Sequence, residues 1–334
     1  MLEEKKSAAF KNAVTVLVSL LIAGLFLWLA LRGLDYEKIK SSLKKANYFW
    51  VAAAAVFGIS AYWFRAIRWN LLLEPMGHKI SNSNSLWSIS FGYLMNLTIP
   101  RSGEVARSTA LYGVEKVPVD KSFGTIILER VIDLICMMIF LGLTLVFKFE
   151  AIKSFYINSG FQPNPLLFSA LFIAGILGIA LFFKFKENFR RFSFISKIID
   201  FIDGIFEGLK SVFKLKQKSK FILYTACIWI CYFFASYLVC FALPETSNFT
   251  LADGCFILVV GTLGMIIPAS GGIGAFNLAM KFGFMALFIS MGKDATAGAE
   301  LGLAYSFITL PLQILIMLVM GLISIPMLAR NRKI

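Results

Sequence analysis

The sequence predicts an all-α integral membrane protein, with two inverted repeats, six full transmembrane helices and two re-entrant helical hairpins. Three observations predict this fold: long apolar segments, a repeated five-residue motif and an uneven distribution of lysine and arginine. Of the 334 residues, 58% are hydrophobic and 16% are charged, whereas a soluble domain is about 45–50% apolar and about 25% charged. The apolar segments are spread over the whole chain, so residues 1–334 are expected to form a single membrane domain with no soluble domain.

Six apolar segments approach or exceed the ~20 residues that a spanning helix needs. They fall into two sets of three, which define repeat one (about 12–147) and repeat two (about 165–328). The first segment is followed by no A-x-A cleavage site, which favours a retained span over a signal peptide. The segments are Asn12–Leu31, Phe49–Ile67, Lys121–Phe147, Leu166–Phe183, Phe221–Leu243 and Ala295–Leu328.

The repeated motif is Ile-Pro-x-Ser-Gly, which occurs at Ile99–Gly103 and again at Ile267–Gly271. Each copy follows a span, an amphipathic stretch and a second span, and each precedes a long apolar helix. Proline lacks an amide hydrogen and disfavours helix at the residue before it. Each motif is therefore expected to separate two half-helices, with Ser102 and Ser270 as the N-caps of the second halves.

The residues that follow the first motif are too polar for contact with lipid, so the half-helices are expected to form a re-entrant hairpin enclosed by protein or a water-filled cavity. Each repeat then crosses the membrane three times, and the odd number inverts the second repeat relative to the first. Inverted repeats with broken helices near the midplane are typical of transporters.

Two amphipathic stretches have helical spacing, which predicts helices that lie in the membrane interface. The first has Tyr36, Ile39 and Leu43 on one face. The second, residues 185–218, is a cytoplasmic or interfacial linker, and a cytoplasmic helix packed on the protein is an equal alternative for it.

The charge distribution predicts the orientation. The segment Lys184–Lys220 contains ten Lys or Arg residues and four acids, whereas Pro244–Asp253 contains no Lys or Arg. The positive-inside rule then predicts a multi-pass protein of the plasma (inner) membrane with both termini in the cytoplasm. One loop, Arg32–Asn47, does not fit, because it is assigned outside and carries five bases against two acids. The net charge of +14 therefore indicates anionic membrane lipids as partners and no nucleic acid.

Ionisable residues gather at the first hairpin and the helix after it. Each would cost about 2.5–3.5 kcal/mol at the bilayer centre, so they are expected to face inward and pair. Glu129 and Asp133 lie one turn apart, Arg130 can reach Asp133, and Arg107 can approach both acids. The group is interpreted either as an anionic-substrate site or as a structural ion-pair network. Its members are Arg101, Glu104, Arg107, Glu129, Arg130 and Asp133.

Features of both hairpins favour the substrate interpretation. The helix starts at Ser102, Gly103 and Ser270 offer unpaired amide hydrogens to an anion, and arginine matches pairs of phosphate oxygens. Glycines allow a headgroup to approach the backbone, although tight hairpin packing explains them equally well. We expect Arg101, Arg107 and Arg130 to line one polar cavity, and we expect no catalytic residue, metal site or cofactor. The glycines are Gly271, Gly272 and Gly274.

Three motifs carry a resemblance to a known family: PRSGE-x-x-R at 100–107, ER-x-x-D at 129–133 and P-x-x-GG-x-G at 268–274. In this order they resemble the flippase-like membrane domain of bacterial lysylphosphatidylglycerol synthases, over roughly Val51 to Leu328. The resemblance implies movement of a phospholipid or polyprenyl-linked lipid between leaflets. The aminoacyl-transferase domain of the bifunctional synthases is not found in this sequence, so lysyl transfer is not expected.

The chain departs from this family at two positions of the second repeat. Members usually have Glu where this chain has Asn277, and often Arg near Ser306. Both differences remove a charge, with opposite signs, so we hypothesise that an ion pair has been lost as a unit.

Two other functions stay open at this level. One is a membrane-embedded enzyme acting on a lipid phosphate, with Glu129 and Asp133 as acid and base. The other is a lipid-binding partner protein without transport.

The orientation can be tested by cysteine-accessibility labelling at Ser247 and Lys216. Ser247 lies in the segment without Lys or Arg, and Lys216 lies in the basic segment, so single cysteines there are expected to react from opposite sides of the membrane. Labelling of both positions from one side would contradict this topology.

Overall fold

The computed structural model describes residues 35–99, 101–159, 215–266 and 270–332, with isolated residues between 21 and 32 and at 199 and 203. Regular structure within these ranges is entirely helical, which confirms the predicted all-α class. The predicted span 166–183, most of the span 12–31 and of the linker 185–218, Pro100 and residues 267–269 lie outside the described residues.

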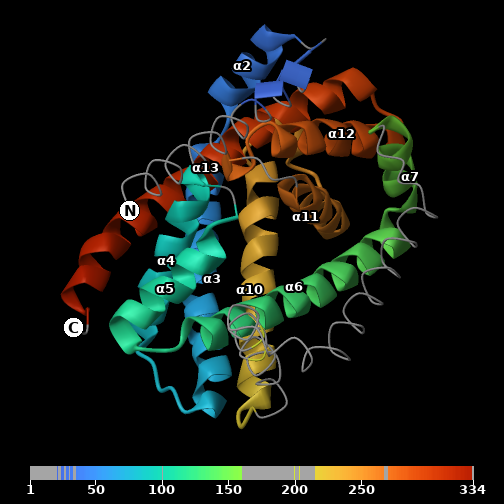
Figure 1. Cartoon of the computed structure of the whole chain (residues 1–334). Coiled ribbons are helices and arrows are strands. Elements are labelled where there is room, and N and C mark those ends of the chain that lie inside the picture. The colour runs from blue at the N-terminus through green and yellow to red at the C-terminus, as the bar shows by residue number, and fades with distance from the viewer. Residues whose placement is uncertain are drawn as a thin grey trace.

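The described helices follow one another in the order shown in Figure 1. Short 3-10 turns lie at Glu74–Met76, Pro244–Thr246 and Ser270–Gly272. The α-helices are α2 (Tyr36–Lys45), α3 (Tyr48–Leu73), α4 (Asn82–Thr98), α5 (Gly103–Glu115), α6 (Val119–Phe147), α7 (Phe149–Asn158), α10 (Lys218–Cys240), α11 (Leu251–Ile266), α12 (Ala275–Ser290) and α13 (Ala295–Arg330).

Among the described residues, four helical segments are long and apolar enough to cross a bilayer: 48–76, 119–147, 218–240 and 295–330. Apolar side chains on α6 stay exposed, for example Leu134 and Ile139, each 58% accessible. Such an exposed apolar surface suits contact with lipid chains. The chain is therefore a multi-pass membrane protein, and the count of six spans stays a prediction.

The centre of the fold is the pair α3 and α10, which lie side by side (Figure 1). Aromatic rings join them: Phe57 stacks on Phe234 with centroids 5.2 Å apart, and Trp50 lies 5.2 Å from Phe241. Helices α4, α6, α11 and α13 pack on this pair, and the other described helices pack on these four or on one another.

Packing partners correspond between the two halves of the chain. The hairpin α4–α5 packs through α4 on α3, and the hairpin α11–α12 packs through α11 on α10. The long helix of each half then crosses to the other, because α6 packs on α11 and α13 packs on α4. This correspondence supports the two-repeat interpretation, while the inversion and the membrane depth of the hairpins stay predictions.

An ion pair anchors the far end of α6. Lys148, the residue after α6, places its Nζ 2.7 Å from Oδ1 of Asp253, which is 1% exposed. The other carboxylate oxygen of Asp253 accepts a hydrogen bond from the Thr250 amide at 2.8 Å. This end of α6 is thus held on the first turn of α11.

The helix starts after the two motifs differ from the prediction. The Ser102 hydroxyl donates to the carbonyls of Met95 and Ile99, at 3.1 and 2.7 Å, and so closes α4 instead of capping α5. The first amide of α5, that of Gly103, donates to Asn96 Oδ1 at 2.7 Å. Ser102 therefore occupies the N-cap position of α5 as predicted, but its side chain makes no capping hydrogen bond, because the hydroxyl bonds carbonyls of the preceding helix.

The second helix start lies four residues later than predicted. Ser270 begins a 3-10 turn, and α12 starts at Ala275 after Gly274. Asn277 Oδ1 accepts a hydrogen bond from the Gly274 amide at 3.0 Å. The cap at Ser270 was therefore wrong, since an intervening glycine turn separates it from the helix.

The hairpin tips lie next to each other. Arg101 Nη2 donates to the Ile266 carbonyl at the end of α11, at 2.5 Å. A Cβ atom built on Gly271 would lie 3.4 Å from Leu97 of α4. The residues that flank the two proline breaks are thus in contact.

The first amphipathic stretch forms α2, whose apolar face is narrower than predicted. Ile39 is 2% exposed and Leu43 packs beside it, but Tyr36 is 65% exposed. Lys38 Nζ lies 3.5 Å from Glu300 Oε1 of α13. Helix α2 packs against α13, and its packed apolar side chains are Ile39 and Leu43.

The packing of α12 on α13 depends on glycine, and this dependence is testable. A Cβ atom at Gly302 would overlap the Met280 carbonyl oxygen and lie 2.9 Å from Phe284 Cβ. We expect Gly302→Ala to lower the free energy of unfolding by about 1–3 kcal/mol through overpacking, measured by thermal unfolding in detergent. The matched control is Gly142→Ala, since a Cβ there meets nothing within 4 Å. Equal stability of the two variants would contradict this account.

Candidate functional site

Arg68 is the centre of a buried charged cluster. It extends from α3, is 0% exposed, and bonds Asp133 Oδ1 of α6 through both Nη atoms at 3.1 and 3.2 Å. Its Nη2 also lies 3.6 Å from Glu129 Oε1, and its Nη1 donates to the Thr225 hydroxyl of α10 at 3.4 Å. One side chain thus connects α3, α6 and α10.

Arg107 joins the first hairpin to this cluster. Its Nη1 donates to Glu129 Oε2 at 2.6 Å, and its guanidinium carbon lies 3.7 Å from the Trp69 ring centroid. Trp69 in turn donates from Nε1 to the Thr125 hydroxyl at 2.8 Å. The cation–π contact and the charge-assisted hydrogen bond together fix the orientation of the guanidinium.

Arg65 lies one turn before Arg68 on α3 and is 3% exposed. Its Nη1 donates to the Tyr232 hydroxyl at 2.7 Å, and its Nη2 lies 3.8 Å from Asp133 Oδ2. The Tyr93 ring lies 5.8 Å from its guanidinium carbon. Arg65 therefore adds a third buried positive charge.

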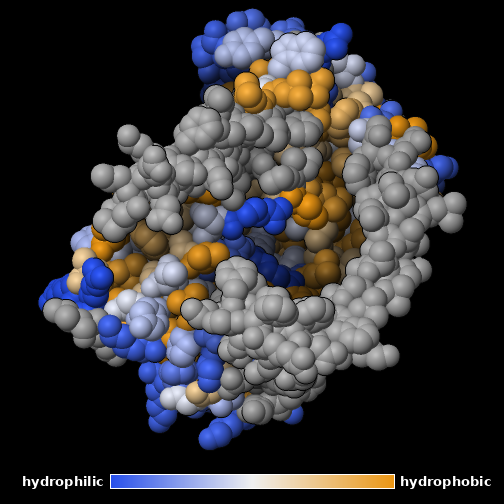
Figure 2. All heavy atoms as spheres, viewed as in Figure 1, coloured by the Kyte–Doolittle hydropathy of each residue, from blue (hydrophilic) through white to orange (hydrophobic). Residues whose placement is uncertain are grey.

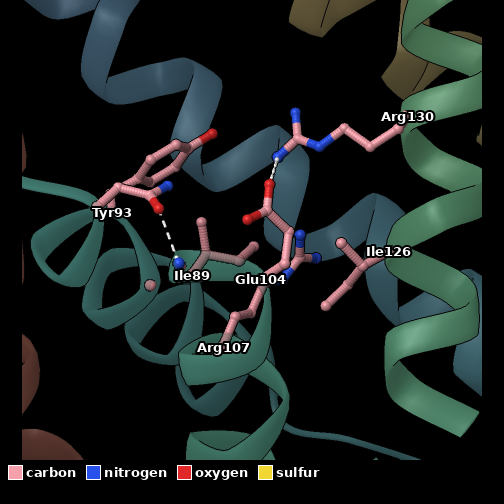
Figure 3. Close-up of a pocket in the computed structure, with 9 residues that line it drawn as sticks. Ile89, Tyr93, Glu104, Arg107, Ile126 and Arg130 are labelled. Atoms are coloured by element: carbon pink, nitrogen blue, oxygen red, sulfur yellow. Dashed lines mark hydrogen bonds and ion pairs between the residues drawn. The ribbon is translucent and has the colours of Figure 1, made fainter. Parts of the chain in front are cut away.

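Arg130 and Glu104 form the accessible part of the cluster, 47% and 26% exposed as side chains. Their charged atoms lie 3.4 Å apart, and Arg130 also lies 3.8 Å from Asp133. Figure 3 shows Arg130 reaching from α6 toward Glu104 of α5.

A cleft lies between the first hairpin and α6, beside these charges. It has about 250 Å³ of empty space, including its open mouth. Figure 2 shows hydrophilic residues in a hollow at the centre of one face, among hydrophobic ones. The residues that line the cleft are Ile89, Gly92, Tyr93, Asn96, Gly103, Glu104, Arg107, Ile126 and Arg130.

We define the arginine cluster as Arg65, Arg68, Arg107 and Arg130 with Glu104, Glu129 and Asp133. Among the described residues, four arginines thus meet three carboxylates, which leaves one positive charge. Several buried donors also have no hydrogen-bond partner within the described ranges. They are Nε of Arg65, Arg68 and Arg107, and Nη2 of Arg65 and Arg107. Buried donors of this kind are normally hydrogen-bonded, and the described residues do not supply the partners.

Most of the predicted contacts are present, while the binding role of these residues stays a prediction. Arg107 meets Glu129, and Arg130 and Asp133 pair as expected. Arg107 and Arg130 line the cleft, but Arg101 does not line it. The Arg101 side chain instead reaches the Ile266 carbonyl, and its place in a shared polar cavity stays a prediction.

Arg65 and Arg68 were not predicted as site residues. Both belong to an apolar helix, and only their one-turn spacing distinguishes them in the sequence. Two cations on one face of a spanning helix need buried partners, and this signal could have indicated them.

The glycines of the second hairpin serve packing in this structure. Gly271, Gly272 and Gly274 have φ of 61, 76 and 82°, a region that favours glycine. A Cβ atom at Gly272 would overlap the sulfur of Met265. These glycines do not line the cleft, and a role in headgroup binding stays a prediction.

Asn277 and Ser306 are in direct contact. The Asn277 amide donates to the Ser306 hydroxyl at 2.7 Å, and both residues are buried. This is the proximity that the hypothesis of a lost ion pair requires, with a neutral hydrogen bond in place of two charges.

The family model of the lysylphosphatidylglycerol synthase TM region matches residues 16–325. The chain belongs to this family. Two similar proteins are archaeal. Glycosyltransferase AglD of Haloferax volcanii is 24% identical over 320 residues, which cover 86% of this chain and 51% of AglD. The UPF0104 membrane protein MJ1595 of Methanocaldococcus jannaschii is 24% identical over 169 residues, 49% of this chain and 48% of the relative.

The chain thus spans about half the length of these family relatives, and no solved structure gives a significant match. The family match covers both hairpins and the whole arginine cluster. The membrane location of the chain therefore rests on the family as well as on the apolar helices.

The role of Glu129 in folding can be tested by Glu129→Gln. This change leaves Arg107 and Arg68 short of a buried partner, and breaking such a pair costs about 3–5 kcal/mol. We expect a large loss of folded yield and thermal stability in detergent. Asp133→Asn, which affects Arg68 in the same way, is expected to act similarly.

The control is Lys40→Ala, which removes an exposed ion pair of α2 with Glu37 and should change stability by about 1 kcal/mol at most. If Glu129→Gln were as stable as Lys40→Ala, the cluster would contribute little to the fold.

Proposed function

We propose that the chain is a flippase-like transporter that moves a lipid with an anionic headgroup between the two membrane leaflets. The lipid is an anionic phospholipid or a polyprenyl-linked lipid. One observation carries the proposal: a buried arginine cluster with an excess positive charge adjoins a cleft in a membrane protein. We place the protein in the plasma (inner) membrane with both termini in the cytoplasm.

The cleft supports this function by its position. One wall is the first hairpin and the other is α6, so a headgroup entering between them meets Arg107 and Arg130 while its chains remain on apolar surface. Arg130 is half-exposed and held by Glu104 at 3.4 Å. An entering anion can replace Glu104 as its partner, because such a pair is weaker than a buried one.

The contact between the hairpin tips supports alternating access. Arg101 of the first hairpin bonds the last carbonyl of α11 in the second. Separation of the tips would open a path between the halves, as in transporters built from inverted repeats. In this proposal Arg101 holds the closed state.

An enzymatic function is the main alternative, since AglD is named a glycosyltransferase. A general base needs a carboxylate free to take a proton. Here Glu129 accepts from Arg107 at 2.6 Å, and Asp133 accepts from Arg68 at 3.1 Å. Both carboxylates are thus engaged, which favours transport over catalysis. A lipid-binding partner protein without transport is the third possibility.

Lipid movement in reconstituted vesicles tests the proposal. Arg107→Ala removes one positive charge from the residues that line the cleft. We therefore expect it to abolish transfer of a labelled anionic lipid between leaflets. Lys40→Ala, on exposed α2, should transport like the unaltered protein. Normal transport by a poorly folding Arg107→Ala would identify the cluster as purely structural.

The same vesicles separate the alternatives. A chemically altered lipid in the extract, dependent on Glu129, would indicate an enzyme. Binding without movement in the unaltered protein would indicate a partner protein.

A further inference from the structure

Helix α2 has one side that packs on the protein and another that carries charge. Ile39 is 2% exposed and Leu43 packs beside it. Lys38 Nζ lies 3.5 Å from Glu300 Oε1, so these contacts turn one side of α2 toward α13. The other side is exposed and carries three lysines, which we define as the α2 lysine face: Lys40, Lys44 and Lys45.

Two of these lysines have no partner within the described part of the chain. Lys40 Nζ lies 3.4 Å from Glu37 Oε1, in an exposed pair on the same helix. The ammonium groups of Lys44 and Lys45 form no hydrogen bond or ion pair with any described residue. A lysine near the C-terminal end of a helix is favoured by the helix dipole alone, so the place of α2 relative to the membrane decides what else these charges meet.

The sequence puts α2 next to the start of a membrane span. Asn47 is the N-cap of α3, and the seventeen residues from Tyr48 to Phe64 include no Lys, Arg, His, Asp or Glu. Lys45 lies only three residues before Tyr48. The chain thus changes from lysine-rich to apolar sequence within one turn of helix, as it does where a span leaves the headgroup region.

Exposed aromatic side chains lie on both sides of this boundary. Tyr36 is 65% exposed, Tyr48 56% and Phe49 71%. The Tyr48 hydroxyl donates to the Leu43 carbonyl at 3.1 Å, which fixes the ring beside the end of α2. Aromatic residues concentrate where hydrocarbon meets headgroups, and lysines on the polar side are typical of helices in the interface.

The α2 lysine face is separate from the arginine cluster. Arg65 lies seventeen residues after Tyr48 on α3, about 26 Å along the helix at 1.5 Å per residue. No lysine of α2 lines the cleft. Figure 1 shows α2 at the end of the molecule opposite to the start of α10. A property of this face is therefore independent of the transport proposed for the cleft.

We propose that the α2 lysine face binds anionic headgroups of glycerophospholipids in the leaflet beside the start of α3. Lys44 and Lys45 supply two unpaired positive charges, and ammonium groups donate to phosphate oxygens. A lipid fits better than a soluble acidic partner, because the exposed rings of Tyr48 and Phe49 adjoin these charges and match the hydrocarbon below a headgroup. The lysines of Arg32–Asn47, the loop that does not follow the positive-inside rule, then serve lipid binding.

Hydrogen exchange of the full chain in nanodiscs tests this proposal, read by mass spectrometry on peptides that cover residues 36–45. Nanodiscs of phosphatidylcholine alone are compared with nanodiscs that also contain phosphatidylglycerol. Bound headgroups hold α2 in place, so we expect its amides to exchange about fivefold more slowly with phosphatidylglycerol, the effect of one lysine at an anionic surface. High salt should reduce the difference. Equal exchange in the two kinds of nanodisc would overturn the proposal.

A double variant, Lys44→Gln with Lys45→Gln, gives a second readout. Both side chains are exposed, so the variant should keep its thermal stability but lose the effect of phosphatidylglycerol on α2. The matched control, Lys218→Gln with Lys220→Gln, removes two exposed lysines at the start of α10 and should keep that effect. An undiminished effect in the α2 variant would also overturn the proposal.

Soluble glycerol phosphate, added to nanodiscs of phosphatidylcholine, separates a free anion from a lipid headgroup. If it protected α2 as well as phosphatidylglycerol does, the face would be a site for free phosphate esters and the lipid proposal would be wrong. Because the readout is local to α2, a chain that fails to move lipid in vesicles can still show the effect, so this proposal and the proposed function fail separately.

Discussion

The fold depends on how the charge of Arg68 is met inside the protein. A guanidinium that is 0% exposed has to find its partners on neighbouring helices, and Arg68 finds them on α6 and α10. The apolar faces of these helices would tolerate many small rotations, because hydrophobic contact has no direction. The ion pair of Arg68 with Asp133, at 3.1 and 3.2 Å, would be broken by such rotations. The cluster therefore specifies how α6 and the first hairpin are arranged around the central pair α3 and α10.

Under the same constraint, the proposed binding site and the fold depend on the same residues. Glu129 orients Arg107 and also neutralises it, so the acid that builds the site reduces its attraction for an anion. In the proposed site, the excess of one arginine over the carboxylates of the described residues restores that attraction without leaving several charges unpaired. A membrane protein with equal numbers of acids and arginines here would be held together as well, but it would have little left for a ligand.

The sequence allowed the all-helical membrane class, the broken hairpins and the pairing of Arg107 with Glu129 to be predicted. The reason is energetic: charges in apolar surroundings must pair, and helical spacing decides which can reach each other. Arg65 and Arg68 were not predicted as site residues, because the apolar sequence around them indicates only a spanning helix. Ser102 was assigned the wrong partner because a hydroxyl at a helix break can serve either helix, and only the bend of the chain decides which.

The C-terminal half of α6, from Asp133 to Lys148, is held by an ion pair at each of its ends. Asp133 is held by Arg68 at one end, and Lys148 is held by Asp253 at the other. Fifteen residues separate them, about 22 Å at the helical rise of 1.5 Å per residue. An inserted residue would turn one anchor by about 100° relative to the other, so the length of this segment cannot drift by single residues. The number of residues between these two contacts is thus fixed by the packing of α6 on α3 and α11.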